Sequence, residues 1–320
     1  SKRHIAPPIQ RRPSPEGLRF LSQRGRGSIA ERNAKLILMV GVLGVSASAI
    51  LVRFSQAPSG VTAAYRLGWT VLLMLPVVLL RCRAELRRVT ARDLVLCGAS
   101  GVLLALHFLT WFESLKRTSV ASSTVLVSTE VIFTALGFAL FLHGKIPRLG
   151  VWAIALAFGG SALLALSGGG GAGELSGNLL ALAAASAAAV YTLIGRIQRG
   201  HLSTTVYTFL TYLACFLTLL LGTAAAGTPL TGYGGREWLI GLALAVLCTL
   251  LGHSLFSWCL KYLSPSYVSA AKLCEPVFSS LAAIPLFGEV PGPLQLAGGA
   301  AVLGAVLLYT WAEREKTPAG

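Results

Sequence analysis

Two opposite charges and a proline lie within an otherwise apolar segment near the C-terminal end of the chain. Lys272 and Glu275 are three residues apart and therefore share one face of a helix, where each lowers the cost of burying the other. Pro276 follows directly and lacks a backbone donor, so we expect a kink and a hinge there. A substrate contact beside a hinge and a structural ion pair between helices both agree with this pattern.

A second carboxylate, Glu130, lies in an earlier apolar segment, with no lysine three residues before it and Val131 where Glu275 has its proline. In hydrocarbon, a carboxylate without a cationic neighbour favours its neutral form, which suits a group that carries protons. Glu130 and Glu275 are therefore candidates for proton coupling as well as for substrate binding. The alternative for Glu130 is an ion pair with Arg66 or Lys272 from another segment.

Two histidines lie in apolar segments with a tryptophan close behind each. Trp111 follows His107 by four residues, and Trp258 follows His253 by five. An imidazole beside an aromatic ring suits a polar or aromatic organic solute, and imidazole also relays protons. The simpler interpretation of each histidine is a hydrogen bond between helices.

Arg66 lies about six residues inside its apolar segment, or about 9 Å from the segment's end. It could extend to the membrane surface, form an ion pair with Glu130 or Glu113, or bind an anionic group of a substrate. Tyr191, in a segment rich in alanine, is a further candidate for the wall of a binding cavity.

The composition requires lipid as the solvent. Of the 320 residues, 54% are hydrophobic and 12% are charged, about half of the charged fraction of ordinary soluble domains. The net charge of +15 would suggest nucleic acid in a soluble protein, but here the basic residues act first as topology signals, and we expect no nucleic-acid partner. Spacings typical of metal or phosphate sites are missing from the sequence, so we expect no metal, cofactor or catalytic residue.

The apolar segments predict an all-α integral membrane protein with ten transmembrane helices. A span needs about 20 apolar residues, and ten segments meet this need: 35–55, 60–80, 93–114, 119–142, 148–167, 177–197, 204–225, 237–260, 266–287 and 293–312. Most Lys and Arg of the connections lie on the N-terminal side, and only Arg53, Lys116, Arg117 and Arg236 lie on the other. The positive-inside rule therefore places both termini in the cytoplasm, with the plasma membrane favoured over an organelle membrane.

The chain contains an internal duplication with an offset of 145 residues, which aligns Glu130 with Glu275 and Leu115-Lys116 with Leu260-Lys261. Each copy holds five spans, an odd number, so the copies must be inverted in the membrane, as in many transporters. We expect a disordered basic tail over 1–34, repeats over 35–167 and 177–312, a Gly-rich linker over 168–176 and a C-terminal tail over 313–320.

The chain resembles the drug/metabolite transporter superfamily, specifically the ten-helix EamA-type proteins. The residues that carry the resemblance are Tyr65-Arg66, Glu275-Pro276-Val277, Leu286-Phe287-Gly288-Glu289 and Leu294-Gln295-Leu296-Ala297-Gly298. The resemblance implies export or exchange of small organic solutes through a central cavity without ATP hydrolysis. The first copy departs from the pattern, because Leu142-His143-Gly144-Lys145 lacks the glutamate found at Glu289.

These observations predict a secondary transporter that moves a small polar organic metabolite, amino-acid-like or drug-like, by alternating access. Export is favoured, with proton coupling as one mechanism. The first alternative is an obligate exchanger of anionic solutes, in which Arg66 and Lys272 bind the anion. A membrane-embedded enzyme is less favoured, because the charges within the spans are few and dispersed.

Overall fold

The structure is a computed structural model that describes residues 15–141, 146–167, 172–198, 202–252, 255, 259, 271 and 273–314. Within these ranges every regular element is a helix. Three residues predicted to line the binding site, His253, Trp258 and Lys272, lie outside the described residues.

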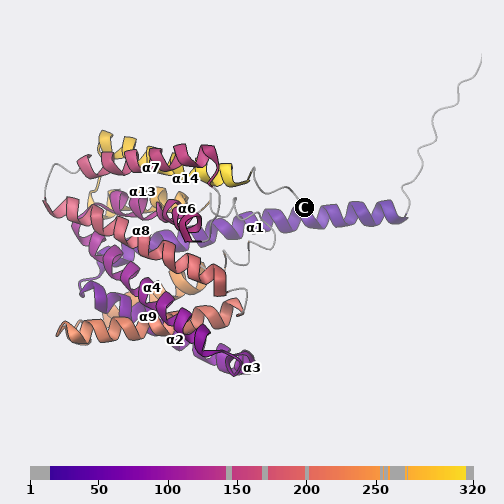
Figure 1. Ribbon diagram of the computed structural model, residues 1–320, viewed down its shortest axis with the longest axis horizontal. Coiled ribbons are helices and arrows are strands. Elements are labelled where there is room, and N and C mark those ends of the chain that lie inside the picture. Colours follow the sequence, from indigo (N-terminus) through magenta and orange to yellow (C-terminus); the bar gives the residue numbers. More distant parts are fainter. Residues whose placement is uncertain are drawn as a thin grey trace, which may run out of the picture.

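The helices follow one another with short connections (Figure 1). The first half contains α1 (Pro15–Phe54), α2 (Ser59–Arg81), α3 (Arg83–Leu86), α4 (Ala91–Arg117), α5 (Val120–Val127), α6 (Glu130–Phe141) and α7 (Arg148–Ser167). The second half contains α8 (Ala172–Gln198), α9 (Thr204–Ala225), α10 (Gly235–Ala243), the π-helix η1 (Leu244–Gly252), α13 (Cys274–Phe287) and α14 (Pro293–Arg314).

The all-α membrane fold predicted from the sequence is confirmed. Among the described residues, eight helical stretches are long and apolar enough to cross a bilayer. Two shorter apolar helices, Arg148–Leu164 and Cys274–Phe287, lie where the fifth and ninth spans are predicted. The total of ten spans stays a prediction.

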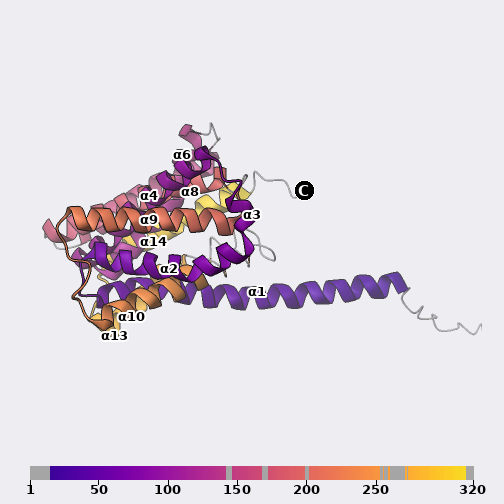
Figure 2. The same cartoon turned by 90° about the horizontal axis from the view of Figure 1, so that it is seen from below.

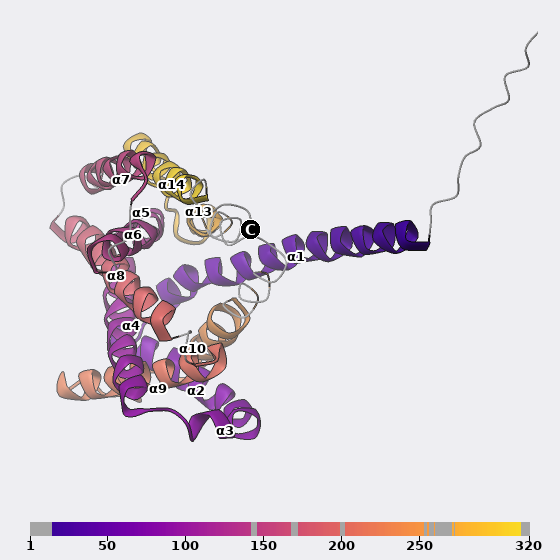
Figure 3. The same cartoon turned by 45° about the vertical axis from the view of Figure 1, so that its right-hand side comes forward.

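Helix packing follows the internal duplication. The start of α9 at Thr204 is 145 residues after the start of α2 at Ser59, and Pro293 of α14 is 145 residues after Arg148 of α7. These related helices pack directly, α2 on α9 and α7 on α14. The contact of α4 with α8 is repeated by the related contact of η1 with α1, as expected for two copies related by a pseudo-two-fold axis. Figure 3 shows α7 with α14 at one end of this arrangement and α2 with α9 at the other.

The first helix starts earlier than its predicted span. Helix α1 begins at Pro15, so residues 15–34 are helical where the sequence analysis predicts disorder. Proline is favoured in the first turn of a helix, and the chain has no other proline until Pro58. The straight extension of α1 beyond the bundle is visible in Figures 1 and 2.

The fourth span is broken directly before Glu130. Helix α5 ends at Val127 and α6 begins at Glu130, although the sequence predicts one continuous span over 119–142. The Ser128 hydroxyl donates to the carbonyl of Thr124, and the Thr129 hydroxyl donates to that of Leu126 at 2.6 Å. Such bonds from side chains to the preceding turn bend helices without a proline, so this break has no clear signal in the sequence.

In the ninth span, Pro276 is the third residue of α13. A proline is tolerated in the first turn, where the N–H lacks a helical acceptor. The kink predicted between Lys272 and Pro276 depends on a residue outside the described ones and stays a prediction. In the eighth span the helix changes to π geometry over Leu244–Gly252, a change that often accompanies functional sites.

Small residues allow the halves to approach closely at the contact of α4 with α9. A Cβ on Gly101 would lie 2.5 Å from the Cβ of Ala214 and 2.7 Å from the carbonyl oxygen of Thr211. Both distances are far below van der Waals contact, so the helices would have to separate.

We therefore expect Gly101→Ala to lower the stability of the purified protein by about 1–3 kcal/mol, the usual cost of overpacking. The measurement is thermal unfolding in detergent. Gly98→Ala is the matched control on the same helix, because its Cβ would meet no atom within 4 Å. Equal effects of the two substitutions would contradict the packing argument.

Candidate substrate site

Arg66 is buried in the centre of the bundle and bonds to hydroxyl groups. Its side chain is only 3% exposed. Nε donates to the Thr249 hydroxyl at 2.9 Å, and Nη1 donates to the Ser48 hydroxyl at 3.1 Å. The guanidinium carbon lies 4.4 Å from the ring centroid of Phe108. These contacts join α2 to α1, η1 and α4.

The alternative partners expected for Arg66 are engaged elsewhere. Glu113 pairs with Arg117 at 2.8 Å and accepts a hydrogen bond from Ser59. Within the described residues no carboxylate lies within 4.0 Å of Arg66, and Nη2 makes no hydrogen bond there. The predicted ion pair with Glu113 or Glu130, and the predicted extension toward the membrane surface, are therefore wrong for this conformation.

His107 and Trp111 form an aromatic row on α4. Their rings stack at 5.8 Å, and His107 also contacts the edge of Phe108 at 5.1 Å. Nδ1 of His107 lies 2.9 Å from the carbonyl oxygen of Ala184 on α8. A carbonyl oxygen only accepts, so Nδ1 carries the proton and Nε2 of a neutral ring is left as an acceptor. The expected interhelical hydrogen bond thus exists together with the aromatic stack.

Trp111 adds an unsatisfied donor to this row. The side chain is 6% exposed, and its indole N–H has no acceptor among the described residues. A buried donor without a partner is costly, on the order of 1–3 kcal/mol. Such a group next to a binding site is a candidate for a contact that forms only with substrate.

Glu130 is the first residue of α6 and reaches the second half of the chain. Its Oε1 accepts a hydrogen bond from the Thr192 hydroxyl of α8 at 2.7 Å. The N-terminal end of a helix carries partial positive charge, so this position interacts favourably with a carboxylate.

Glu275 holds a related place as the second residue of α13. Helix α13 packs on α1, the helix that supplies the Arg66 partner Ser48. Tyr191, one residue before the Glu130 partner Thr192, is partly buried and packs against the central core. The structure therefore joins Arg66, His107 and Trp111 through the Phe108 ring, and it connects both His107 and Glu130 to α8.

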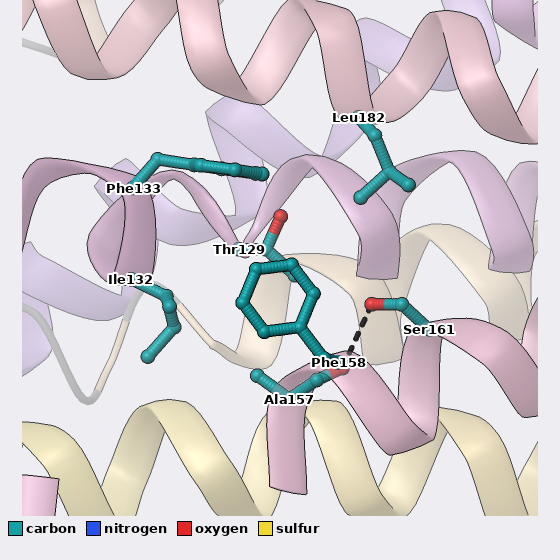
Figure 4. Close-up of a pocket in the computed structure, with 7 residues that line it drawn as sticks. All are labelled: Thr129, Ile132, Phe133, Ala157, Phe158, Ser161 and Leu182. Carbon is teal, nitrogen blue, oxygen red and sulfur yellow. Dashed lines mark hydrogen bonds between the residues drawn. The ribbon is translucent and has the colours of Figure 1, made fainter. Parts of the chain in front are cut away.

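A small hollow lies beside the break in the fourth span (Figure 4). It is lined mostly by apolar side chains: Thr129, Ile132, Phe133, Ala157, Phe158, Ser161 and Leu182. The two hydroxyl groups bond to carbonyls, Thr129 to Leu126 and Ser161 to Ala157. With its polar groups already satisfied, this hollow does not suit a polar solute, and the Arg66 region is the better candidate.

A second charged cluster closes the end of the bundle where α1 meets α2. Arg53 forms an ion pair with Glu289 and donates to the carbonyl of Leu115 at 2.5 Å. The other oxygen of Glu289 accepts the backbone N–H of Val120 at 2.7 Å. Phe287 lies under the guanidinium at 5.3 Å. This cluster links three connections, from α1 to α2, from α4 to α5 and from α13 to α14.

Sequence reasoning missed the groups that hold the charges in place. Phe108, Ser48, Thr249 and Thr192 were not predicted as site residues. Phe108 had a usable signal, since it directly follows His107 in an apolar helix. Hydroxyl residues are common in membrane helices, so nothing in the sequence marks Ser48, Thr249 and Thr192 as site residues.

Two related sets of apolar helices bury the Arg66 cation, with Glu130 and Glu275 half-buried, and these features define a multi-pass membrane protein. The family model of the EamA-like transporter family matches residues 33–166 and 175–311, so the chain belongs to this family. The two matches correspond to the two halves of the duplication.

Two curated relatives are named as exporters. A probable terminal-alkyne amino-acid exporter of Streptantibioticus cattleyicolor is 28% identical over 233 residues, which are 69% of this chain and 75% of that protein. The pseudopaline exporter CntI of Pseudomonas aeruginosa is 24% identical over 207 residues, 65% of this chain and 72% of that protein. A solved crystal structure matches with a TM-score of 0.57 at 20% identity, covering 88% of this chain and 98% of the other, and this likeness shows the fold alone.

The hydrogen bond from Arg66 to Thr249 should make the effects of substituting the two residues on the free energy of unfolding non-additive. We expect Thr249→Val to lower the free energy of unfolding by about 1–3 kcal/mol, because it leaves a buried N–H without an acceptor. In an Arg66→Met background the same substitution should cost little, since the donor is gone. Thermal unfolding of the four proteins measures both effects.

The control is Thr208→Val, since the Thr208 hydroxyl bonds only to carbonyls of its own helix. A loss for Thr249→Val that is the same with and without Arg66 would show that the hydroxyl does not act through the guanidinium.

Proposed function

We propose that the protein exports a small polar organic metabolite of amino-acid type by alternating access to the Arg66 region. The observation that carries this proposal is a buried guanidinium held by two neutral hydroxyls and one aromatic ring. Burying a cation without a close carboxylate is expensive, so such groups in membrane proteins usually serve function. A substrate carboxylate would complete the coordination of Arg66.

The charges around Arg66 favour a zwitterion over a simple anion. Glu130 bonds to Thr192 of α8, the helix to which His107 also bonds. Glu275 lies in α13, which packs on the helix that supplies one of the hydroxyl partners of Arg66. A substrate with a carboxylate and an ammonium group could place the first on Arg66 and the second toward Glu130 or Glu275. The amino-acid exporter among the relatives supports this substrate class.

Glu130 is our candidate for proton coupling. Thr192 and the N-terminal end of α6 both interact favourably with its carboxylate when it is charged. A substrate ammonium group would provide a competing countercharge. When substrate leaves, a proton can take its place, so that proton and substrate binding at this carboxylate exclude each other. Glu275 is the second candidate, at the related position.

An obligate exchanger of anionic solutes is the alternative, with Arg66 and Lys272 as the anion-binding pair. Buried Arg66 supports this function too, but the two nearby glutamates disfavour a substrate that carries only negative charge. For the exporter we propose the plasma membrane, with both termini in the cytoplasm. Membership of a transporter family supports transport over an enzymatic role.

The substrate class can be tested by ligand-dependent stability. Amino acids at about 100 times their dissociation constant should stabilise the purified protein by about 2.7 kcal/mol. The matching amides and the amines that lack a carboxylate should not. Arg66→Gln should remove the stabilisation, whereas Arg117→Gln, at the exposed end of α4, should keep it. Equal stabilisation by the amines, or its survival in Arg66→Gln, would exclude Arg66 as the carboxylate site.

Coupling can be tested in liposomes with a solute found by that screen. Transport should respond to an imposed pH gradient and should not need a counter-substrate in the opposite compartment. Glu130→Gln should abolish the response to the gradient while leaving the protein folded. Glu174→Gln, in the first turn of α8, serves as the control. An unchanged response in Glu130→Gln contradicts the coupling role, and a strict need for counter-substrate indicates the exchanger.

A further inference from the structure

The connection from α2 to α4 carries five exposed arginines within twelve residues: Arg81, Arg83, Arg87, Arg88 and Arg92. Among the described residues, none of their guanidinium groups forms an ion pair or a side-chain hydrogen bond. Orientation in the membrane requires basic residues on this side, but it does not require them to be held together on an ordered segment.

The acidic groups of this connection are used to fix it in place. Glu85 accepts the backbone N–H of Ser203 at 2.6 Å, at the start of α9. Asp93 accepts the backbone N–H and the hydroxyl of Thr90 in a capping box that begins α4. Both carboxylates thus serve helix ends, and the exposed charge of the segment is positive.

Apolar packing against α9 also holds the connection from α2 to α4 in place. Cys82, Leu86 and Val89 pack against a buried cluster that includes Val206 and Tyr207 of α9. The backbone between α2 and α4 is therefore anchored by apolar contacts, while the five arginines are exposed. A fixed set of cations loses less entropy on binding an anion than a mobile tail does.

Exposed apolar side chains flank the arginines directly. At the end of α2, Leu80 is 83% exposed, and near the start of α4, Val95 is 69% exposed. Leu79 and Leu94 beside them are also exposed. Figure 2 shows α3 at the end of the bundle from which α1 extends.

We propose that this connection is a binding site for an anionic phospholipid of the leaflet on that side. The phosphate of the head group contacts the arginines, and the acyl chains lie along the exposed leucines and valine of α2 and α4. Guanidinium groups suit phosphate through paired N–H donors. The exposed apolar side chains favour a lipid over a soluble phosphate, because only a lipid can contact the arginines with its head group and the apolar side chains with its acyl chains.

Native mass spectrometry of the full-length protein measures this directly, with phosphatidylglycerol and phosphatidylcholine of the same chain length as probes. We expect retained phosphatidylglycerol on the unmodified protein and at least about tenfold weaker retention for Arg83→Gln with Arg87→Gln and Arg88→Gln. The corresponding lysine variant should keep most of the binding, because the charge remains.

The matched control is Arg19→Gln with Arg24→Gln and Arg26→Gln, which removes the same charge from the extension of α1. It should retain phosphatidylglycerol as the unmodified protein does. Equal loss in this control, no loss in the first variant, or equal retention of phosphatidylcholine would overturn the proposal. Displacement of the lipid by millimolar inorganic phosphate would instead show a site for soluble phosphate, and would overturn it as well.

Discussion

A cation in the middle of an apolar bundle must find partners inside the protein, and Arg66 shows how this chain meets that constraint. Two hydroxyls and a phenyl ring surround the guanidinium in place of a carboxylate. Because these groups come from α1, η1 and α4, the position of one side chain helps to fix four helical elements. Among the described residues no carboxylate lies within 4.0 Å of the guanidinium, which is why we propose that it binds the carboxylate of a substrate.

Each repeat begins a helix at or just before its glutamate, but the residues that flank this start differ. Glu130 and Glu275 align in the duplication, and both lie in the first turn of a helix, α6 and α13. In the fourth span the break comes from Ser128 and Thr129, which bond to the preceding turn. In the ninth span a proline occupies the first turn of the helix. The glutamates are thus more alike in their helical setting than their flanking sequences suggest, and the larger difference between the halves is Arg66, which aligns with Thr211.

Much of the fold could be predicted from the sequence because hydropathy and turn residues act locally. The duplication offset even matches the observed starts of α2 and α9. The site was harder to predict, since partners such as Ser48 and Thr249 come from distant parts of the chain and their residue types are common in membrane helices. The break before Glu130 also escaped prediction, because hydroxyl groups caused it and no proline or glycine was involved. Glu289 was noted as part of a motif, but its partner Arg53 lies 236 residues away.

The cluster of Arg53 and Glu289 has no charged counterpart in the duplication, where Gln198 aligns with Arg53. Glu289 binds both a guanidinium and the N–H of Val120, so it holds the connection between α13 and α14 against the first repeat. In the duplication Gly144 takes the place of Glu289, and a glycine cannot form the corresponding ion pair. The ion pair is partly buried, at 23% and 19% side-chain exposure, so that separating the partners would leave two partly desolvated charges. In the alternating access that we propose, opening this end must separate Arg53 from Glu289, and substrate can favour the open state only by binding it more tightly, because a ligand shifts an equilibrium only through its different affinity for the two states.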